Sequence, residues 1–498
     1  MEYIKCMSSP RLTAADRDFF TILARVVFGN PFSRERAADI AHLVPDATPG
    51  DLISDREALA RVVGPRLETR LGGGCASIQA FGAEDRALLE PALLYVCYHR
   101  YVAQLDALIE SQVAHESKSP IVKFADDAMA ELVRDGISEE RAARYFAFYF
   151  QLRRAFYFIH RGLAGECPSM QRLRKSLWNN IFTHDMRGFE AALWNRMEDF
   201  STLLLGETGT GKGSAAAAIG RSGFIPYLPG QRRFATSFTE SFIAINLSQY
   251  PESLIESELF GHRKGAFTGA IESHDGVFAR CSPHGSLFLD EIGEVSMPIQ
   301  TKLLQVLQER TFTPIGGHEK SKFAGRVIAA TNQPLDRMRR EGRFREDFYY
   351  RLCSDVIEMP TLRQRLDESP GELEQLVDLL VTRIAGEPAS GLVASVMEAV
   401  DRDIPRDYAW PGNVRELEQA VRRILLTGHY ATETPHSPES EVEKLVSSMQ
   451  VGELTSEDLL RYYGALLYRR FGKVTEVARR MAVDPRTARK YVEGAGSD

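Results

Sequence analysis

Apolar residues recur at helical spacing through the first third of the chain. The segments Glu90–Glu116 and Glu139–Leu163 carry them in this way, and the spacing is that of one apolar face of an α-helix. Few Gly or Pro residues interrupt these segments. The pattern therefore predicts an all-α N-terminal domain over residues 1–172.

The second of these segments is unusually rich in rings: Tyr145, Phe146, Phe148, Tyr149, Phe150, Phe156, Tyr157 and Phe158. We favour a helix packed into an aromatic core, and a ligand pocket or a dimer seam stays open. The acidic pair Asp126-Asp127 lies in a helical context and not at the end of a strand. We expect this pair on a solvated face, and we do not expect a phosphorylated receiver domain here.

From about Leu173 the pattern changes to short apolar strands that alternate with helices. The predicted strands are Ser201–Leu205, Phe242–Ile245, Gly285–Leu289 and Arg326–Ala330. Such alternation is typical of a parallel sheet flanked by helices. The polar, Arg-bearing stretch 222–241 is predicted to be a surface loop. The predicted α/β domain runs over residues 173–427.

A phosphate-binding loop follows the first of these strands and precedes an Ala-rich helix. It comprises Gly206, Glu207, Thr208, Gly209, Thr210, Gly211 and Lys212. Glycines let backbone N–H groups converge on phosphate, the helix N-terminus adds positive potential, and the lysine reaches the terminal phosphates of ATP. The next residue is ordinarily Ser or Thr, which binds Mg²⁺, but here it is Gly213. Ser214 is rotated away and is a poor substitute.

Two adjacent acids, Asp290 and Glu291, end the strand Gly285–Leu289. Ligands of open α/β sheets bind at the carboxyl ends of strands. We expect Asp290 to hold the magnesium shell. Glu291 is expected to orient and deprotonate the water that attacks ATP.

One further loop is unusual: Gly265, Ala266, Phe267, Thr268, Gly269 and Ala270. Its glycines permit backbone shapes that other residues avoid. An aromatic side chain on such a loop is typical of a contact with another protein. The alternative is a turn whose Phe267 packs into the core. The Thr268 hydroxyl is expected to hold the shape of the loop, as short polar side chains do in turns.

Taken in order, these segments resemble the AAA+ domain of the bacterial activators of sigma-54 RNA polymerase. All six residues of the Phe267 loop match the family's sigma-contacting loop. The resemblance implies that Asn246 is the switch asparagine, Asn332 the first sensor and Arg415 the second sensor, in a helical lid. Arg345 and Arg351 align with arginine fingers that act on a neighbouring subunit, which implies a ring, a hexamer in the family. That family commonly has Glu where this chain has Gly213.

The C-terminal segment reads as three short helices, Ser456–Phe471, Lys473–Met481 and Pro485–Val492, after a polar linker over residues 428–454. The last two resemble the helix-turn-helix that ends this family. Residues 455–498 carry nine Lys and Arg against six Asp and Glu. A recognition helix reads DNA with such side chains, here Arg486, Thr487, Arg489 and Lys490. A small helical dimer domain is the alternative.

Charge and composition limit where this chemistry can act. The net charge of −7 gives no global basic field, so a DNA-binding patch must be local. The six cysteines lack metal-ligand spacing, which is typical of reduced thiols in a cytosol. No apolar run is long enough to span a bilayer. We expect a bacterial cytoplasmic protein that does not bind membranes.

Together these features predict an ATP- and Mg²⁺-dependent transcription activator. It would bind double-stranded DNA upstream of promoters, assemble a ring with copies of itself, and remodel sigma-54 RNA polymerase holoenzyme. Two alternatives from other classes stay open. One is a DNA-binding regulator that keeps the AAA+ fold without remodelling polymerase, and the other is an AAA+ chaperone or chelatase.

Overall fold

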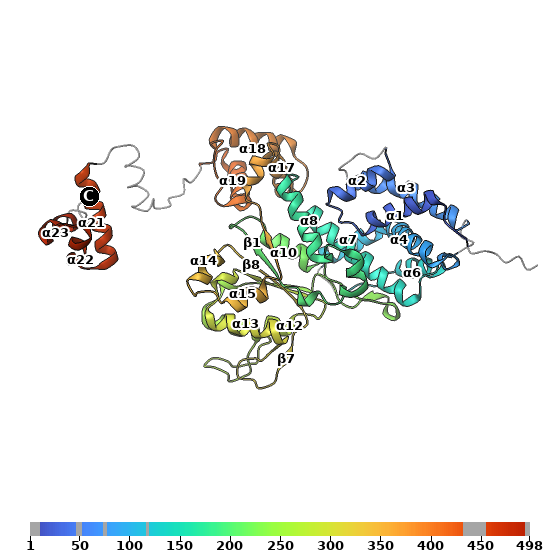
Figure 1. The fold of residues 1–498 in the computed structure, drawn as a ribbon, viewed down its shortest axis with the longest axis horizontal. Helices are drawn as coiled ribbons and strands as arrows, with labels where there is room; N and C mark the ends of the chain where they lie inside the picture. Colours follow the sequence, from blue (N-terminus) through green and yellow to red (C-terminus); the bar gives the residue numbers. More distant parts are fainter. Residues whose placement is uncertain (1–9, 46–51, 73–76, 116–118, 432–454, 494–498) are drawn as a thin grey trace, which may run out of the picture. The chain divides into compact units, whose positions relative to one another are not determined.

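The structure is a computed structural model that describes residues 10–45, 52–72, 77–115, 119–431 and 455–493. The chain forms two compact units, Met1–Tyr430 and Ala431–Asp498. Figure 1 shows the first unit as a parallel sheet, an array of N-terminal helices and a group of helices that follows the sheet in sequence. Most of the predicted linker 428–454 lies outside the described residues.

The N-terminal part of the first unit is helical, as predicted. Its helices are α1 (Ala14–Phe28), α2 (Arg34–Leu43), α3 (Leu52–Arg70), α4 (Ala83–Arg100), α5 (Val102–His115), α6 (Ala125–Arg134), α7 (Glu139–Gly162) and α8 (Pro168–Phe182). The segment predicted as one helix from Glu90 is broken at Tyr101, whose N–H bonds to Tyr98 O and closes a tighter final turn. Helix α8 spans the boundary that the pattern placed at 172/173. Asp126 and Asp127 are exposed on α6.

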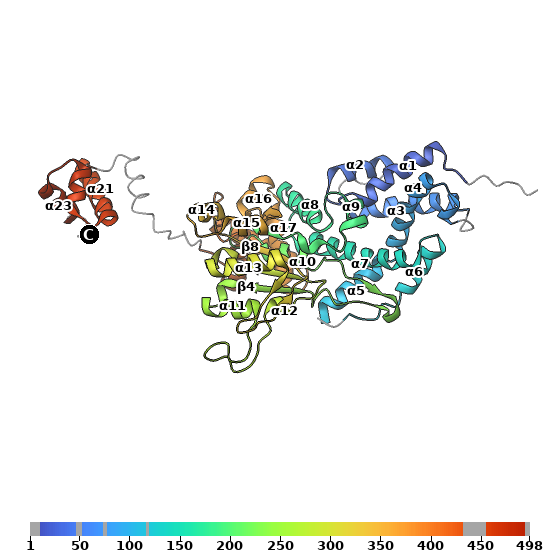
Figure 2. The ribbon, with the colours of Figure 1, turned by 60° about the horizontal axis from the view of Figure 1, so that its bottom comes forward.

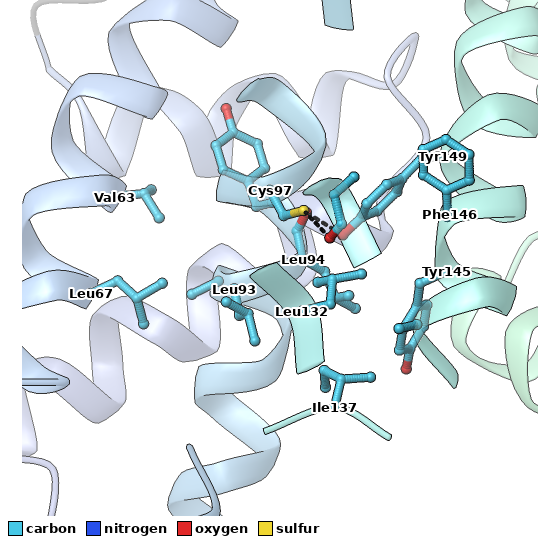
Figure 3. Close-up of a cluster of buried hydrophobic side chains, with 14 of the residues drawn as sticks. Val63, Leu67, Leu93, Leu94, Cys97, Leu132, Ile137, Tyr145, Phe146 and Tyr149 are labelled. Atoms are coloured by element: carbon cyan, nitrogen blue, oxygen red, sulfur yellow. Dashed lines mark hydrogen bonds between the residues drawn. The ribbon is translucent and has the colours of Figure 1, made fainter. Parts of the chain in front are cut away.

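The aromatic helix α7 is largely a core element, as favoured from the sequence. Phe146 and Phe150 are fully buried, and the Tyr149 hydroxyl donates a hydrogen bond to Leu94 O at 2.9 Å. Figure 3 shows Tyr145, Phe146 and Tyr149 of α7 facing apolar side chains of α3, α4 and α6. Phe156, Tyr157 and Phe158 are only half-buried. The second half of the helix therefore leaves room for other contacts.

The stretch 222–241 is not a surface loop, contrary to the prediction. It forms the hairpin β2 (Tyr227–Leu228) and β3 (Arg233–Phe234). Its apolar residues Tyr227, Phe234 and Phe238 are buried in the same cluster as Phe146 and Phe150 of α7. The four aromatic residues of this stretch show no clear period along the sequence, but each one packs in or against the N-terminal core. The α/β domain thus inserts a hairpin into the helical domain.

The central sheet has five parallel strands in the order β4-β5-β8-β1-β9, which confirms the predicted fold class for this region. The strands are β1 (Thr202–Leu205), β4 (Phe242–Asn246), β5 (Ser286–Asp290), β8 (Arg326–Thr331) and β9 (Asp355–Glu358). Side chains alternate between the two faces. All six residues of β8 are buried, as expected for a strand covered on both faces.

The two faces of the sheet are covered by different sets of helices. Leu203, Leu287 and Ala329 pack with the helices of the α/β domain: α11 (Glu252–Phe260), α12 (Val277–Arg280), α13 (Met297–Glu309), α14 (Leu335–Arg340) and α15 (Glu346–Leu352). Leu204 and Ile328, on the other face, pack with α8 and with α10 (Lys212–Gly220). In Figure 2, α8 and α10 lie between the sheet and the other N-terminal helices. The N-terminal domain therefore contributes directly to the core beneath the sheet.

A helical subdomain follows the last strand. It contains α16 (Leu362–Glu368), α17 (Glu372–Ala385), α18 (Ser390–Asp403) and α19 (Asn413–Thr427), which share one apolar cluster. Other short elements include α9 (Met186–Gly188), β6 (Thr311–Phe312) and β7 (Ser321–Lys322). The arrangement is a parallel α/β core with a helical lid.

The described part of the second unit, residues 455–493, contains three helices, α21 (Ser456–Phe471), α22 (Val474–Met481) and α23 (Pro485–Glu493). Their limits agree with the predicted segments to within a residue. A small core of Leu467, Val477 and Ala488 holds them together. Between α22 and α23 the chain turns at Ala482, which has a φ of +56°.

Candidate active site

A cavity of about 410 Å³ lies at the carboxyl ends of the sheet strands. The phosphate loop, the ends of β4 and β5, the lid and the end of α7 all contribute to its wall. Ten of the residues predicted for catalysis or nucleotide binding line it: Thr208, Gly209, Thr210, Gly211, Lys212, Gly213, Asn246, Asp290, Glu291 and Arg415. Five others, Gly206, Glu207, Asn332, Arg345 and Arg351, are not part of its lining.

The phosphate loop has the backbone shape that its glycines permit. Gly209 and Gly211 have φ values of +80° and +94°, a region that residues with a Cβ rarely adopt. A Cβ at Gly209 would also lie 2.2 Å from Gly412 O. The Lys212 ammonium donates to Gly206 O at 2.7 Å and to Glu207 O at 3.0 Å. The Lys212 side chain therefore folds back onto its own loop, and a phosphate could replace these two carbonyls as its hydrogen-bond acceptor.

The two acids of β5 have different surroundings. Glu291 has a φ of +56°, and its backbone N–H donates to Asp290 Oδ1 at 3.1 Å. The Glu291 Oε2 atom is buried and, within the described residues, has no hydrogen-bond partner. Burial and the charge of Asp290 raise the pKa of Glu291, although Lys212 acts in the opposite direction. A carboxylate with a raised pKa and an unused oxygen is suited to accept a proton from water.

The cavity offers few protein ligands for a metal ion. Within the described residues, no group of three His, Cys, Asp or Glu side chains could hold one. Mg²⁺ commonly binds through one or two carboxylates together with the phosphates of the nucleotide, and Asp290 fits that role. A Cβ at Gly213 would meet no atom within 4 Å. The chain thus has space, but no side chain, where a Ser or Thr hydroxyl ordinarily binds the ion.

The two predicted polar sensors at strand ends make local contacts. The Asn246 side-chain oxygen accepts hydrogen bonds from Ser248 N at 3.0 Å and from Ser248 Oγ at 2.7 Å. It therefore caps a turn in this structure, within the cavity that holds Glu291. Asn332 Nδ2 donates to Thr208 Oγ1 at 3.0 Å. The backbone of Asn332 also lies near enough to Glu291 to favour its charged form.

The start of α19 joins the lid to the phosphate loop. Asn413 is buried, has a φ of +52°, and donates from Nδ2 to Glu207 Oε2 and Thr208 O, both at 3.0 Å. Val414 N donates to Gly209 O at 3.1 Å. These bonds place Arg415 in the wall of the cavity. Asn tolerates a positive φ better than most residues.

Three cationic residues in the cavity wall had no sequence signal, and one of them, Arg365, is neutralised by the buried Glu372 at 2.6 Å. Of the other two, Arg161 comes from the end of α7 and Arg383 from α17 of the lid. Neither belongs to a motif, because each lies far in sequence from the phosphate loop. Both bring positive charge to a cavity that the sequence predicts for a polyphosphate.

The two predicted arginine fingers are held at the surface of the α/β domain. Arg345 forms a two-pronged ion pair with Asp347, at 2.9 and 2.7 Å. Arg351 donates from Nε and Nη2 to Leu307 O, at 3.0 and 2.9 Å. Neither side chain reaches the cavity of its own chain.

The predicted sigma-contacting loop projects between α11 and α12, where Figure 2 shows loops that extend away from the helices. Gly265 and Gly269 have φ values of +81° and +101°, and Gly265 N donates to Ala270 O at 2.8 Å. Phe267 is 40% exposed and packs edge-on to the His262 ring, with centroids 4.9 Å apart. The core interpretation of Phe267 is therefore wrong.

Backbone contacts, and not the Thr268 hydroxyl, give this loop its shape. Among the hydrogen bonds of the described residues, none involves the Thr268 side chain, contrary to the prediction. At the base of the loop, Arg263 N donates to Ile315 O at 3.0 Å. A Cβ at Gly316 would come within 2.8 Å of the Ala266 Cβ. The loop that joins β6 to β7 thus supports the Phe267 loop from the side.

The four predicted DNA-binding residues lie on α23 of the second unit. Arg486, Arg489 and Lys490 are exposed, and Thr487 is half-buried. Asp484 begins the helix by accepting hydrogen bonds from Arg486 N at 2.9 Å and Thr487 N at 3.1 Å. Lys490 pairs with Glu457 of α21 at 3.1 Å.

Comparison with known proteins agrees with this geometry. The family model described as "Sigma-54 interaction domain" matches residues 186–358. The chain is 35% identical over 342 residues to the transcriptional regulatory protein ZraR of Klebsiella oxytoca, a match that covers 66% of this chain and 67% of ZraR. It is 39% identical over 263 residues to the DNA-binding transcriptional regulator NtrC of Azospirillum brasilense, covering 53% of this chain and 47% of NtrC.

More distant likenesses add little. A solved structure of NtrX from Brucella abortus in complex with ATP covers 75% of this chain and 81% of NtrX, with 21% identity and a TM-score of 0.40. At this level the likeness supports no conclusion. The matches to NtrC of Azospirillum brasilense and of Rhizobium meliloti span 47% and 54% of those relatives, about half their length.

The parallel sheet, phosphate loop and helical lid place the chain among the AAA+ transcription regulators. More narrowly, the chain belongs to the family of sigma-54-dependent transcriptional activators. None of the described helices is long and apolar enough to cross a membrane.

Proposed function

We propose that this chain hydrolyses ATP and uses the reaction to press the Phe267 loop against sigma-54 in RNA polymerase, so that promoters open. One observation carries the proposal. The same α/β domain holds both a nucleotide cavity with an unused base, Glu291 Oε2, and an exposed aromatic loop that takes no part in the cavity. The proposed site of ATP hydrolysis and the proposed site of sigma-54 contact are thus separate parts of one domain.

Within the cavity, the residues divide the work by their chemistry. Backbone N–H groups of residues 206–212 and the Lys212 ammonium would hold the phosphates. Asp290 would hold Mg²⁺, which shields the phosphate charge when it is bound. Glu291 would take a proton from the attacking water. Asn246 would leave its turn to restrain Glu291, Asn332 would read the γ-phosphate, and Arg415 would bind the nucleotide from the lid.

Assembly and DNA binding complete the proposal. Arg345 and Arg351 are not part of the lining of their own cavity, which suits fingers that reach the nucleotide of a neighbouring copy in a ring. Arginine is suited to that role because its planar fork matches phosphate oxygens. We assign residues 455–498 to DNA binding through α23, residues 173–427 to the motor, and residues 1–172 to its regulation.

A reconstituted transcription assay tests the function. Full-length protein, ATP and a promoter with its upstream DNA are combined with either the sigma-54 or the sigma-70 holoenzyme, and open complexes are detected by permanganate footprinting. We expect open complexes only with sigma-54 and only with hydrolysable ATP. ATP turnover without any open complex at a sigma-54 promoter would contradict the proposal and favour a DNA-binding regulator that does not remodel polymerase.

A further inference from the structure

A second cavity, of about 120 Å³, lies inside the N-terminal domain. Helices α1, α4, α7 and α8 supply an almost continuous wall of rings: Phe28, Tyr95, Tyr98, Phe148, Phe156 and Trp178. It adjoins the core in Figure 3, whose Leu94, Tyr145 and Tyr149 also belong to its lining. An apolar cavity costs stability when it stays empty. A concave apolar site with a few polar groups is the usual form of a small-molecule site.

The polar groups of this cavity are mostly cationic. Arg36 of α2, Arg56 of α3 and Arg153 of α7 line it, with Glu190 as the one acidic side chain in the lining. Arg153 is neutralised by Asp106, at 2.5 and 2.7 Å. Glu190 is likewise paired, with Arg144 at 2.8 Å. The charge left over in the wall is therefore that of Arg36 and Arg56.

These two arginines have weak or incomplete partners. Arg36 donates from Nε to Val26 O at 2.9 Å, and no hydrogen bond of its Nη groups exists within the described residues. Burial lowers the pKa of Arg36, and the charge of Asp55 acts in the opposite direction. Arg56 lies 3.9 Å from Glu57, a carboxylate that is 62% exposed. As residues, Arg36 and Arg56 are both half-buried, and burial is sufficient to lower the pKa of the Arg36 guanidinium.

The same wall contains a histidine, His99, whose pKa is affected by this excess of positive charge. The His99 ring packs against Tyr95 at a tilted angle of 59°, with ring centroids 4.1 Å apart. Burial, followed by the charges of Arg56 and Arg36, keeps the pKa of His99 well below its usual value. At neutral pH this imidazole is uncharged. The cavity thus presents apolar rings together with two guanidinium groups in its wall.

We propose that this cavity is a binding site for a small organic acid with an apolar body no larger than about one six-membered ring. The volume is close to that of engineered apolar cavities that bind benzene, about 150 Å³. The rings would enclose the body, and Arg36 and Arg56 would bind the carboxylate through charge-assisted hydrogen bonds. A neutral ring would lose those bonds, and an amine would be repelled.

Helix α7 connects this site to the nucleotide cavity. Phe148, Arg153 and Phe156 line the small cavity, and Arg161 and Gly162 at the end of the same helix line the nucleotide cavity. A bound acid would fix the position of α7 along its length. Since binding at two coupled sites is reciprocal, the acid should change the affinity for nucleotide.

Other contacts of α7 reach the helix that carries the phosphate loop. Arg154 is fully buried and donates to Arg221 O at 2.6 Å and to Gly223 O at 2.8 Å, just beyond α10. Gln151 donates to Ser222 O at 3.0 Å. A displacement of α7 would therefore move the end of α10, whose start is Lys212. This coupling rests on the proposed function only in assuming that the larger cavity binds ATP.

Binding is tested on the full-length protein by calorimetry and thermal unfolding with four probes: benzoate, cyclohexanecarboxylate, benzyl alcohol and benzylamine. We expect both carboxylates to bind and to raise Tm, the alcohol to bind at least ~10-fold more weakly for want of charged hydrogen bonds, and the amine not to bind. Equal binding of all four probes, or binding of none, would overturn the site.

Variants locate the bound acid. Arg36→Met and Arg56→Met should each weaken benzoate at least ~10-fold. Arg61→Met, on the exposed face of α3, should leave it unchanged and serves as the matched control. Loss of binding in all three variants, or in none, would contradict the assignment. Because the probe series uses wild-type protein, it decides the question even if a variant does not fold.

Coupling is measured as the Kd of a non-hydrolysable ATP analogue with and without saturating benzoate. We expect a change of about fivefold or more, matched by an equal change in the Kd of benzoate when the analogue is present. An unchanged analogue Kd with bound benzoate would overturn the coupling. If the analogue does not bind at all, the proposed ATPase function fails, while the probe series still decides the small-molecule site.

Discussion

The two cavities along α7 are built in opposite ways. The nucleotide cavity is shaped by backbone groups and charged side chains, and most of its predicted members come from short runs of consecutive residues. The small cavity is shaped by rings from helices separated by up to about 150 residues of sequence. A phosphate needs converging N–H groups, which one glycine-rich turn provides. The apolar part of a ligand needs only apolar side chains packed around it, and any helices that pack together can provide them.

This difference has a consequence for regulation. The nucleotide cavity has little freedom to vary, because its backbone shape is tied to Gly209 and Gly211 and to the bonds of Asn413. The small cavity depends on side-chain volume and can accept many substitutions. A chain can therefore change the compound that it senses while the motor stays the same. Helix α7 lines both sites and carries the contact between them.

The largest expected effect is the loss of ATP hydrolysis in the nucleotide cavity when Glu291 is replaced. Glu291→Gln should lower ATP turnover by at least ~10²-fold, because the amide cannot accept the proton of water. ATP binding, measured by fluorescence titration, should persist. Glu294→Gln, an exposed acid on the same turn, is the control. Near-wild-type turnover in Glu291→Gln would rule out this residue as the base.

A second expected effect breaks the connection between the cavities. Arg154→Met should lower the free energy of unfolding by about 2 kcal/mol, because Arg221 O and Gly223 O lose a charged donor inside the protein. The measurement is urea unfolding without nucleotide. Arg161→Met removes an exposed pair with Glu110 and should cost less than about 1 kcal/mol. Equal losses in the two variants would contradict the role of Arg154.

A smaller effect sharpens the account of Gly213. Replacement of a helical glycine by alanine stabilises a helix by about 1 kcal/mol or less, and a Cβ at this position meets no atom within 4 Å. Gly213→Ala should therefore raise Tm. Gly213→Thr should lower the Mg²⁺ concentration that half-saturates ATP turnover, because it restores a hydroxyl. Gly213→Ala is its control, and the same Mg²⁺ requirement in both variants would exclude a metal-binding role for position 213.

The smallest expected effect concerns the contact between α8 and the lid. Burial raises the pKa of Glu368, but hydrogen bonds from Ser169 and Arg172 outweigh it and lower the pKa to about 2, from 4.5. The carboxylate therefore contributes stability above pH 4.5 that is lost as pH falls towards 2. Glu368→Gln should reduce the fall in Tm across this range. An identical pH dependence in variant and wild type would mean that the contact adds nothing to stability.

Sequence patterns predicted the parallel sheet, the N-terminal helices and eight of the ten residues that meet in the nucleotide cavity, because the phosphate loop and the acid pair each follow a strand of clear apolar character. Asn246 and Arg415 were assigned by the resemblance to the activator family. The prediction for the hairpin 222–241 was wrong, because Phe234 and Phe238 do not recur at the spacing of a strand or a helix. Their role is to pack against Phe150 of α7, which the sequence pattern does not reveal. Arg161 and Arg383 were missed for the same reason. Their proximity to the phosphate loop depends on how the helices pack.

We propose above all that the Phe267 loop carries the output of ATP turnover. The direct measurement compares the ATPase rate with open-complex formation at a sigma-54 promoter, in the same preparation, for Phe267→Ala. The control is Ile271→Ala, an apolar residue just outside the loop that is 78% exposed. We expect Phe267→Ala to keep ATP turnover within a few-fold of wild type and to abolish open complexes, and Ile271→Ala to keep both. If Phe267→Ala lost both activities, or lost neither, the claim would be contradicted.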